Sequence, residues 1–273
     1  MVFCSTRHPN TQAEYSIFRS THHSQHGSCS EPLEARPHHP SWRHSAQQAS
    51  RNSPFPMSFS KSSPSDEQVS ETEILDVAPI DLIHGMSKHF IDSMPDGFMP
   101  PELKAQALDM EFHWVSETDG PCRLTSSISM NPTDTFETCP PLDVVLMGAH
   151  HPSYTPSAAE LAYIRKAYDA SSAFLTICGG LMAPLQAGVL DGKTVTAPRF
   201  MLGRLRETNP SSTWLEKRWV RDGKLWTSGA LLNGADMVSA FVREHWGRQE
   251  GSLAWTMADI GAWPNRDVDY RDA

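Results

Sequence analysis

The sequence lacks the features that mark a membrane protein or a disulfide-rich protein. Its 273 residues contain no run of about 18 or more apolar residues, so we expect no transmembrane helix and no membrane partner. The five cysteines are an odd number at irregular spacings and include no CxxC pair. This pattern excludes a disulfide framework or a structural zinc site as the organising feature, and it favours an intracellular chain with reduced thiols.

Beyond the N-terminal quarter of the chain, acidic residues clearly outnumber basic ones. The formal charge is −9, and residues 1–65 carry six basic and three acidic side chains, which leaves −12 on residues 66–273. Such an acidic body offers no basic stripe to a phosphate backbone. We therefore expect a small-molecule substrate and no nucleic-acid partner.

Residues 1–69 also lack apolar periodicity and are rich in Pro, Ser, His and Gln, which predicts a disordered leader. An Arg- and Ser-rich, acid-poor composition fits a mitochondrial transit peptide, although seven prolines disfavour the usual amphipathic helix. Alternatively, Met57 is the true start and the leader is an artefact of gene prediction. We expect a cytoplasmic protein, or a mitochondrial one if the leader is real.

From about residue 70 the pattern becomes that of an α/β domain. Continuous apolar runs at residues 142–147 and 173–177 are typical of strands buried on both faces of a parallel sheet. Strands that alternate with helices predict a parallel sheet covered on both faces. We place one domain at residues 70–258 and a tail at residues 259–273. The remaining predicted elements are strands at 110–115 and 194–196, helices at 75–86, 157–169, 181–190 and 237–246, and a hairpin around Asp222-Gly223.

Cys178 follows the second apolar run and precedes Gly179-Gly180 and a predicted helix. A nucleophile at such a turn projects at the carboxyl edge of the sheet, where open α/β folds bind ligands. The helix N-terminus would lower the pKa of its thiol, and the next backbone N–H would stabilise an oxyanion or a developing carbanion. The alternative is that Cys178 is one more buried cysteine, and the local pattern fits both interpretations.

Four segments in order resemble the ThiJ/PfpI superfamily, the class I glutamine-amidotransferase-like proteins. The first two segments are most similar to isocyanide-hydratase-like proteins, fungal ones included. The resemblance implies a flavodoxin-like parallel sheet sandwiched by helices, usually in a homodimer, with a reactive elbow cysteine and a nearby acid. The segments are LDVAPID at 75–81, CPPLDVVL at 139–146, TICGG at 176–180 with AGVLDGK at 187–193, and WTSG at 226–229 with NGAD at 233–236.

Carried over by position, the resemblance makes Cys178 the nucleophile and Asp76 the acid. In a hydratase the thiolate would attack the terminal carbon of an isocyanide while Asp76 supplies the proton. Water would then release an N-substituted formamide, and neither a metal nor an organic cofactor is needed. Without the resemblance, the local sequence favours Asp76 as an N-cap or first-turn acid of a helix, ahead of Val77-Ala78-Pro79.

The same carry-over assigns an oxyanion or substrate pocket to Gly179, Ala149, His150 and Pro198, each of which departs from the family pattern. Gly179 stands where isocyanide hydratases commonly have threonine. Ala149 and His150 replace a Gly-Gly pair, and Pro198 stands near the place of a histidine found in many relatives. Loss of that imidazole weakens protease, amidotransferase and glyoxalase interpretations. His150 or His151 either replaces it in space or is simply solvated.

The largest departure lies upstream of Asp76. Relatives have an apolar central strand there, whereas residues 66–73 contain a single valine. We therefore expect the first central strand to be missing or degenerate, with a misplaced Asp76 and an inactive protein as one consequence. Three functions follow from the sequence: a cofactor-free hydratase or lyase, a glyoxalase or deglycase on small reactive carbonyls, and a non-catalytic redox sensor or scaffold.

Overall fold

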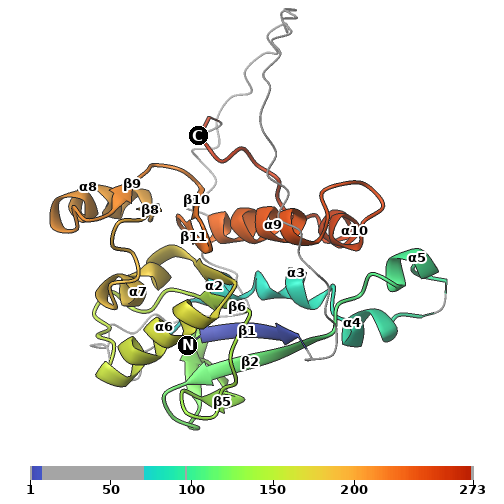
Figure 1. The fold of residues 1–273 in the computed structure, drawn as a ribbon, viewed down its shortest axis with the longest axis horizontal. Helices are drawn as coiled ribbons and strands as arrows, with labels where there is room; N and C mark the ends of the chain where they lie inside the picture. Colours follow the sequence, from blue (N-terminus) through green and yellow to red (C-terminus); the bar gives the residue numbers. More distant parts are fainter. Residues whose placement is uncertain (1, 8–70, 96, 272–273) are drawn as a thin grey trace, which may run out of the picture. The chain divides into compact units, whose positions relative to one another are not determined.

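Seven strands form one mixed sheet in the order β10-β11-β7-β6-β1-β2-β5 (Figure 1). The structure is a computed structural model that describes residues 2–7, 71–95 and 97–271, so most of the predicted leader, Met57 included, lies outside the described residues. The strands are β1 (Val2–Arg7), β2 (Met110–Ser116), β5 (Asp134–Thr135), β6 (Val144–Met147), β7 (Ala173–Thr176), β10 (Trp219–Asp222) and β11 (Leu225–Ser228).

β6, β7 and β11 pair in parallel at one side of the sheet, and β5 pairs in parallel with β2 at its far edge. Every residue of β6 and of β7 is buried, as their continuous apolar sequences predict. Because side chains alternate along a strand, Val144 and Leu146 pack on one face while Val145 and Met147 pack on the other. The flavodoxin-like α/β class predicted from the sequence is confirmed.

Helices cover both faces of this sheet (Figure 1). One apolar cluster contains residues of α3 (Ile80–His84), α9 (Leu232–Trp246) and α10 (Leu253–Ile260). The other contains residues of α6 (Ala158–Ala170), α7 (Met182–Gln186) and α8 (Arg199–Thr208). Among the described residues, no helix is long and apolar enough to cross a membrane.

The remaining elements of the described chain are short. They connect the main strands and helices, and two of them form a hairpin beside the carboxyl end of the sheet. They are α2 (Ile74–Val77), α4 (Lys88–Asp92), α5 (Pro101–Lys104), β3 (Cys122–Leu124), η2 (Thr125–Ser127), β4 (Ile128–Met130), η3 (Cys178–Leu181), β8 (Thr194–Val195) and β9 (Thr213–Trp214).

The centre of the sheet differs from the sequence-based expectation. β1, from the extreme N-terminus, lies between β6 and β2 and pairs antiparallel with both, with Val2 opposite Met147 on one side and Val115 on the other. The structure therefore contains a central strand at this place, although residues 71–73 just before α2 do not form it. The expectation of a disordered segment at residues 1–69 does not hold for Val2–Arg7, because backbone pairing on both sides outweighs a weak local pattern.

The C-terminal part contains one confirmed prediction and one boundary that falls differently. β10 and β11 form the predicted hairpin, with Asp222 opposite Leu225 and Gly223 at φ 62°. Only glycine adopts such a φ without strain, which explains the Asp-Gly pair. α10 crosses the predicted boundary between residues 258 and 259.

Candidate active site

Cys178 lies directly after β7 and Ile177, at the start of η3. Its φ is 56°, in the left-handed region, which costs a residue other than glycine about 1–3 kcal/mol. Gly180 makes this turn sterically feasible, because a Cβ there would lie 2.4 Å from the backbone oxygen of Met147. The chain thus holds the half-buried thiol in a strained turn packed on the end of β6.

Asp76 lies in α2 and is completely buried. Its Oδ2 accepts a hydrogen bond from the backbone N–H of Ala149 at 2.9 Å, and its Oδ1 has no hydrogen-bond partner among the described residues. Gly148 lets this carboxyl approach, because a Cβ there would lie 2.9 Å from the Cβ of Asp76. Asp76 is not the N-cap of α2, which is Glu73, but it does lie in the first turn of that helix, as the alternative interpretation expected.

Glu73 completes a cluster with these two residues. One carboxylate oxygen each of Glu73 and Asp76 and the sulfur of Cys178 all lie within 4.8 Å of one another. Glu73 Oε2 is buried and, like Asp76 Oδ1, makes no hydrogen bond to a described residue. Such a set of donors could hold a metal ion, although two carboxylates and a thiol also suit proton transfer. Glu73 was not predicted from the sequence, because it lies in extended backbone as the N-cap of α2 and meets the other two groups only through the fold.

Burial dominates the electrostatics of the two central groups. It raises the pKa of Asp76 from 3.8 to about 7, with the charge of Glu73 adding to the rise and the Ala149 N–H opposing it. Burial and the charge of Asp76 raise the pKa of Cys178 from 9.0 to about 11. The expected lowering of the thiol pKa is therefore wrong. The turn leads only into the four-residue η3 and the five-residue α7, whose dipoles do not outweigh burial beside two carboxylates.

Two backbone N–H groups oppose this rise. Those of Gly179 and Leu231 donate toward the sulfur and stabilise its thiolate form. Leu231 is the N-cap of α9, with φ 20° and ψ −87°, and it lies 53 positions after Cys178 in the sequence. Sequence reasoning found Gly179 because it follows Cys178, but it had no local signal for Leu231.

The C-terminal tail fixes the start of α9, next to Leu231. Asp236 is buried and accepts two hydrogen bonds from the Arg266 guanidinium, at 2.9 and 2.6 Å. The Tyr270 hydroxyl donates to Asn233 Oδ1 at 2.9 Å. This contact ties Asn233, in the first turn of α9, to the C-terminal tail.

The predicted pocket residues do not all lie at the cysteine. Ala149 is beside both groups, because its N–H holds Asp76 and its Cβ lies 3.3 Å from the place of a Cβ on Gly179. His150 instead bonds Thr72 Oγ1 through Nδ1 at 3.2 Å. Pro198 is the N-cap of α8, and no hydrogen bond of the described chain joins it to Cys178.

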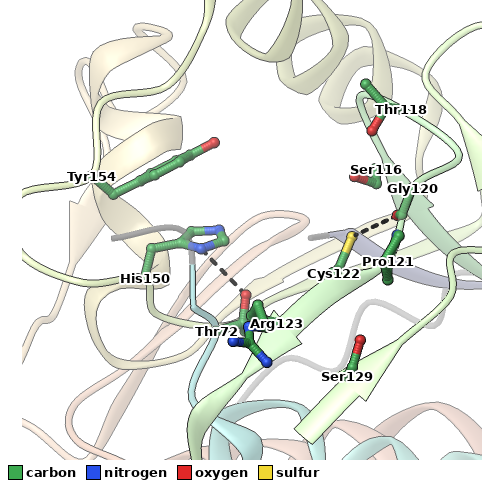
Figure 2. A pocket seen from close by; sticks show the side chains of 10 residues that line it. All are labelled: Thr72, Ser116, Thr118, Gly120, Pro121, Cys122, Arg123, Ser129, His150 and Tyr154. Carbon is green, nitrogen blue, oxygen red and sulfur yellow. Dashed lines mark hydrogen bonds between the residues drawn. The ribbon is translucent and has the colours of Figure 1, made fainter. Parts of the chain in front are cut away.

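A cavity of about 500 Å³ lies beside this cluster, next to the β3–β4 hairpin (Figure 2). Its wall includes Thr72, directly before Glu73, and His150, directly after Ala149. The ring of Tyr154 stacks on His150 with centroids 4.4 Å apart. The cavity and the cysteine cluster are therefore built on the same two chain segments.

Comparison with known proteins now identifies the chain's relatives. A sequence profile described as the DJ-1/PfpI family matches residues 97–244, more than half of the chain. This chain belongs to the DJ-1/PfpI family. Isonitrile hydratase from Pseudomonas putida is 27% identical over 178 residues, which cover 63% of this chain and 76% of that protein.

Solved structures with the same fold agree with this membership. A ThiJ/PfpI family protein from Pseudomonas syringae aligns with a TM-score of 0.54 and 19% identity, over 79% of this chain and 85% of its own. Schizosaccharomyces pombe DJ-1 aligns with a TM-score of 0.52 and 11% identity, over 71% of this chain and 96% of its own. At these identities the likeness concerns the fold. Cys178 lies inside the segment matched by the family, whereas Asp76 lies before it.

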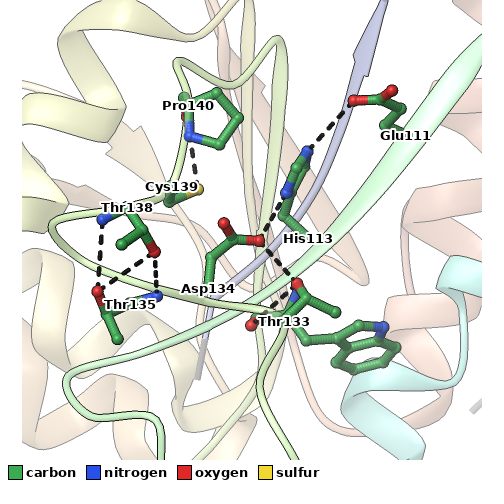
Figure 3. A network of polar contacts seen from close by, with 9 residues as sticks. Glu111, His113, Thr133, Asp134, Thr135, Thr138, Cys139 and Pro140 are labelled. Atoms are coloured by element: carbon green, nitrogen blue, oxygen red, sulfur yellow. Dashed lines mark hydrogen bonds and ion pairs between the residues drawn. The ribbon is translucent and has the colours of Figure 1, made fainter.

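A second polar cluster in this DJ-1/PfpI chain surrounds His113 of β2, and its contacts indicate a structural role (Figure 3). His113 Nδ1 and Asp134 Oδ2 are 2.7 Å apart, and Thr133 Oγ1 donates to the same oxygen at 2.8 Å. Burial raises the pKa of Asp134, but these two hydrogen bonds and the His113 charge outweigh it, so the pKa lies below its usual value. The pair ties β5 to β2.

Proposed function

We propose that this chain is a cysteine-dependent hydratase that converts a small isonitrile into an N-substituted formamide. The observation that carries the proposal is a thiol beside a buried carboxyl whose pKa is about 7. The thiol proton and the carboxylate are both present between about pH 7 and about pH 11, so a proton can move from one to the other in neutral solution. The similarity to the Pseudomonas putida isonitrile hydratase supports the choice of substrate.

In the first step the Asp76 carboxylate removes the thiol proton as the Cys178 sulfur attacks the terminal isonitrile carbon. The S–C bond forms, and Asp76 delivers the same proton to that carbon, which gives a thioimidate. Asp76 Oδ1 suits this transfer because it is buried and makes no hydrogen bond to a described residue, while Oδ2 is held by Ala149. The N–H groups of Gly179 and Leu231 stabilise the sulfur while it is charged.

In the second step water adds to the thioimidate carbon. A C–O bond forms, and one water proton reaches the nitrogen through Asp76. The C–S bond then breaks, and the departing sulfur takes the hydroxyl proton back as a thiol. The product is the N-substituted formamide, and the step sequence uses no metal or organic cofactor. In this proposal the turn with φ 56° acts as a nucleophile elbow, because it aims the sulfur out of the sheet edge.

A glyoxalase or deglycase uses the same thiol on a carbonyl carbon and is the second candidate. Such chemistry usually relies on an imidazole beside the thiol. The Nδ1 atoms of His150 and His151 are engaged elsewhere, by Thr72 Oγ1 at 3.2 Å and by the backbone N–H of Ser153 at 3.2 Å. This arrangement favours the hydratase.

Incubation with cyclohexyl isocyanide or methylglyoxal separates the candidates. The hydratase proposal predicts N-cyclohexylformamide, observed by mass spectrometry, and its loss in Cys178→Ser. Cys139→Ser, at a buried cysteine outside both the cluster and the cavity lining, is the matched control and should keep the activity. Hydroxy acid from methylglyoxal without formamide would favour the glyoxalase, and turnover of neither compound would favour a redox sensor or scaffold.

A further inference from the structure

The cavity beside the cysteine cluster has a distinctive chemical lining. Five of its ten residues carry hydroxyl groups, one is an arginine, and none carries a carboxylate. This lining contrasts with a chain body of net charge −12 and with the two acids next to Cys178. A volume of about 500 Å³ lies within the range of small-ligand sites. The residues are Thr72, Ser116, Thr118, Gly120, Pro121, Cys122, Arg123, Ser129, His150 and Tyr154.

One side of the cavity is held rigid by contacts that join it to the cysteine cluster. The Glu73 N–H donates to the Ala149 carbonyl at 3.0 Å, so the segments that carry Thr72 and His150 lie side by side. The Thr72 N–H in turn donates to the Arg123 carbonyl at 3.1 Å and attaches β3 to them. Figure 2 shows Thr72, Arg123 and His150 together, with Ser116 and Cys122 across the cavity. A ligand group in this cavity is thus fixed relative to Glu73 and Asp76.

The donors that line the cavity select an anion. Arg123 supplies the one permanently charged side chain of the lining, and its planar guanidinium matches a carboxylate in two parallel hydrogen bonds. The hydroxyls of Ser116 and Ser129 add neutral donors. A phosphate is also an anion, but the two acids of the neighbouring cysteine cluster repel its second charge, so the setting favours a singly charged carboxylate.

We propose that this cavity binds a carboxylate on the substrate, with Arg123 as the residue that determines specificity for it. The inference rests on the proposed function and names the substrate class, a short isonitrile that carries a carboxylate. In this proposal the carboxylate binds at Arg123 while the reacting carbon is attacked at Cys178. Isocyanoacetate and its methyl ester form a matched pair of probes that differ in this charge.

Direct binding tests the inference without turnover. N-formylglycine, the product expected from isocyanoacetate, should bind to the wild-type protein in calorimetry at least about tenfold more tightly than N-formylglycine methyl ester. Arg123→Gln should remove this preference, and Arg123→Lys, which keeps the charge but loses the planar fork, should retain part of it. Arg204→Gln, an exposed change on α8, is the control and should bind like the wild type. Equal binding of acid and ester by the wild type would overturn the inference.

Turnover separates this inference from the proposed function. Arg123→Gln should raise KM for isocyanoacetate about tenfold or more and leave kcat/KM for the methyl ester within about threefold. Ser129→Ala removes a neutral donor from the cavity without a change of charge. It should give a smaller rise in KM for isocyanoacetate and no change for the methyl ester. An equal loss of kcat/KM for both substrates in Arg123→Gln would contradict the role of Arg123. If the wild type hydrates neither these probes nor cyclohexyl isocyanide, the proposed function fails, and the binding preference still decides the inference.

Discussion

Cys178 and Asp76 shape each other's protonation. The charge of Asp76 raises the pKa of the thiol, and burial raises the pKa of Asp76 itself. A free thiolate is therefore rare at neutral pH, and the nucleophile is generated only when the carboxylate takes its proton. The strained turn at Cys178 fixes the direction of the sulfur during this transfer.

Thiol alkylation measures this coupling. The rate of reaction of Cys178 with iodoacetamide should rise with an apparent pKa near 11 and be slow at pH 7. Asp76→Asn removes the neighbouring charge, so the thiol pKa should fall and alkylation at pH 8 should accelerate. Peptide mass mapping distinguishes Cys178 from Cys122 and Cys139. A wild-type rate that reaches its plateau below pH 8 would contradict the assignment.

The raised pKa of Asp76 also predicts a pH dependence of stability. The carboxyl is protonated in the folded state up to about pH 7 but ionises near 3.8 when unfolded. The stability due to the protonated form is thus complete below pH 3.8 and is lost as the pH rises to 7. Relative to Asp76→Asn, the wild type should lose about 4 kcal/mol of unfolding free energy across this window, and no more above it. Urea titrations at pH 4 and pH 7 measure the difference, and a difference that is independent of pH would contradict the assignment.

Individual site residues could be predicted from the sequence where a local pattern indicated them. Cys178 follows an apolar run and precedes two glycines, and Asp76 lies in a recognisable family segment. Glu73 and Leu231 were missed because their roles arise from tertiary contacts: Glu73 meets the sulfur only after α2 docks, and Leu231 approaches from the start of α9. The expected low thiol pKa was wrong because burial cannot be judged from the turn sequence.

At the scale of elements, β1 determines whether the sheet is continuous. It supplies hydrogen bonds to β2 on one side and β6 on the other. The buried strands were predictable from their apolar runs, whereas β1 was not, because its pairing partners lie more than 100 residues away in the sequence. Contacts at such a separation leave little trace in local composition.

A proline in β1 tests this arrangement. Ser5 lies opposite Phe112 of β2 and Val144 of β6, so Ser5→Pro removes a backbone donor in the middle of the sheet. The variant should lose about 1–3 kcal/mol of unfolding free energy, measured by urea titration. Ser5→Ala, which keeps the backbone donor, is the control. Equal stability of both variants would show that β1 does not pair in the sheet.

At the scale of the whole molecule, we propose a homodimer, as the family resemblance implies. Exposed apolar side chains lie on α2 and α9 beside the active site: Leu75 is 48% exposed and Leu232 is 61% exposed. Because α2 and α9 contact each other, one partner could cover both residues. Light scattering should give twice the chain mass of 30.4 kDa, and Leu75→Asp with Leu232→Asp should give a monomer. A wild-type monomer would contradict the proposal.

The central claim is that Cys178 and Asp76 act as one unit on an isonitrile. The most direct test is the rate of N-cyclohexylformamide formation by the wild type, Cys178→Ser, Asp76→Asn and the double variant. Each single variant should lower kcat about 1,000-fold or more, and the double variant should be no slower than the slower single variant, because residues that act together show non-additive losses. A Cys178→Ser variant that keeps the wild-type rate, or losses that simply multiply in the double variant, would contradict the account.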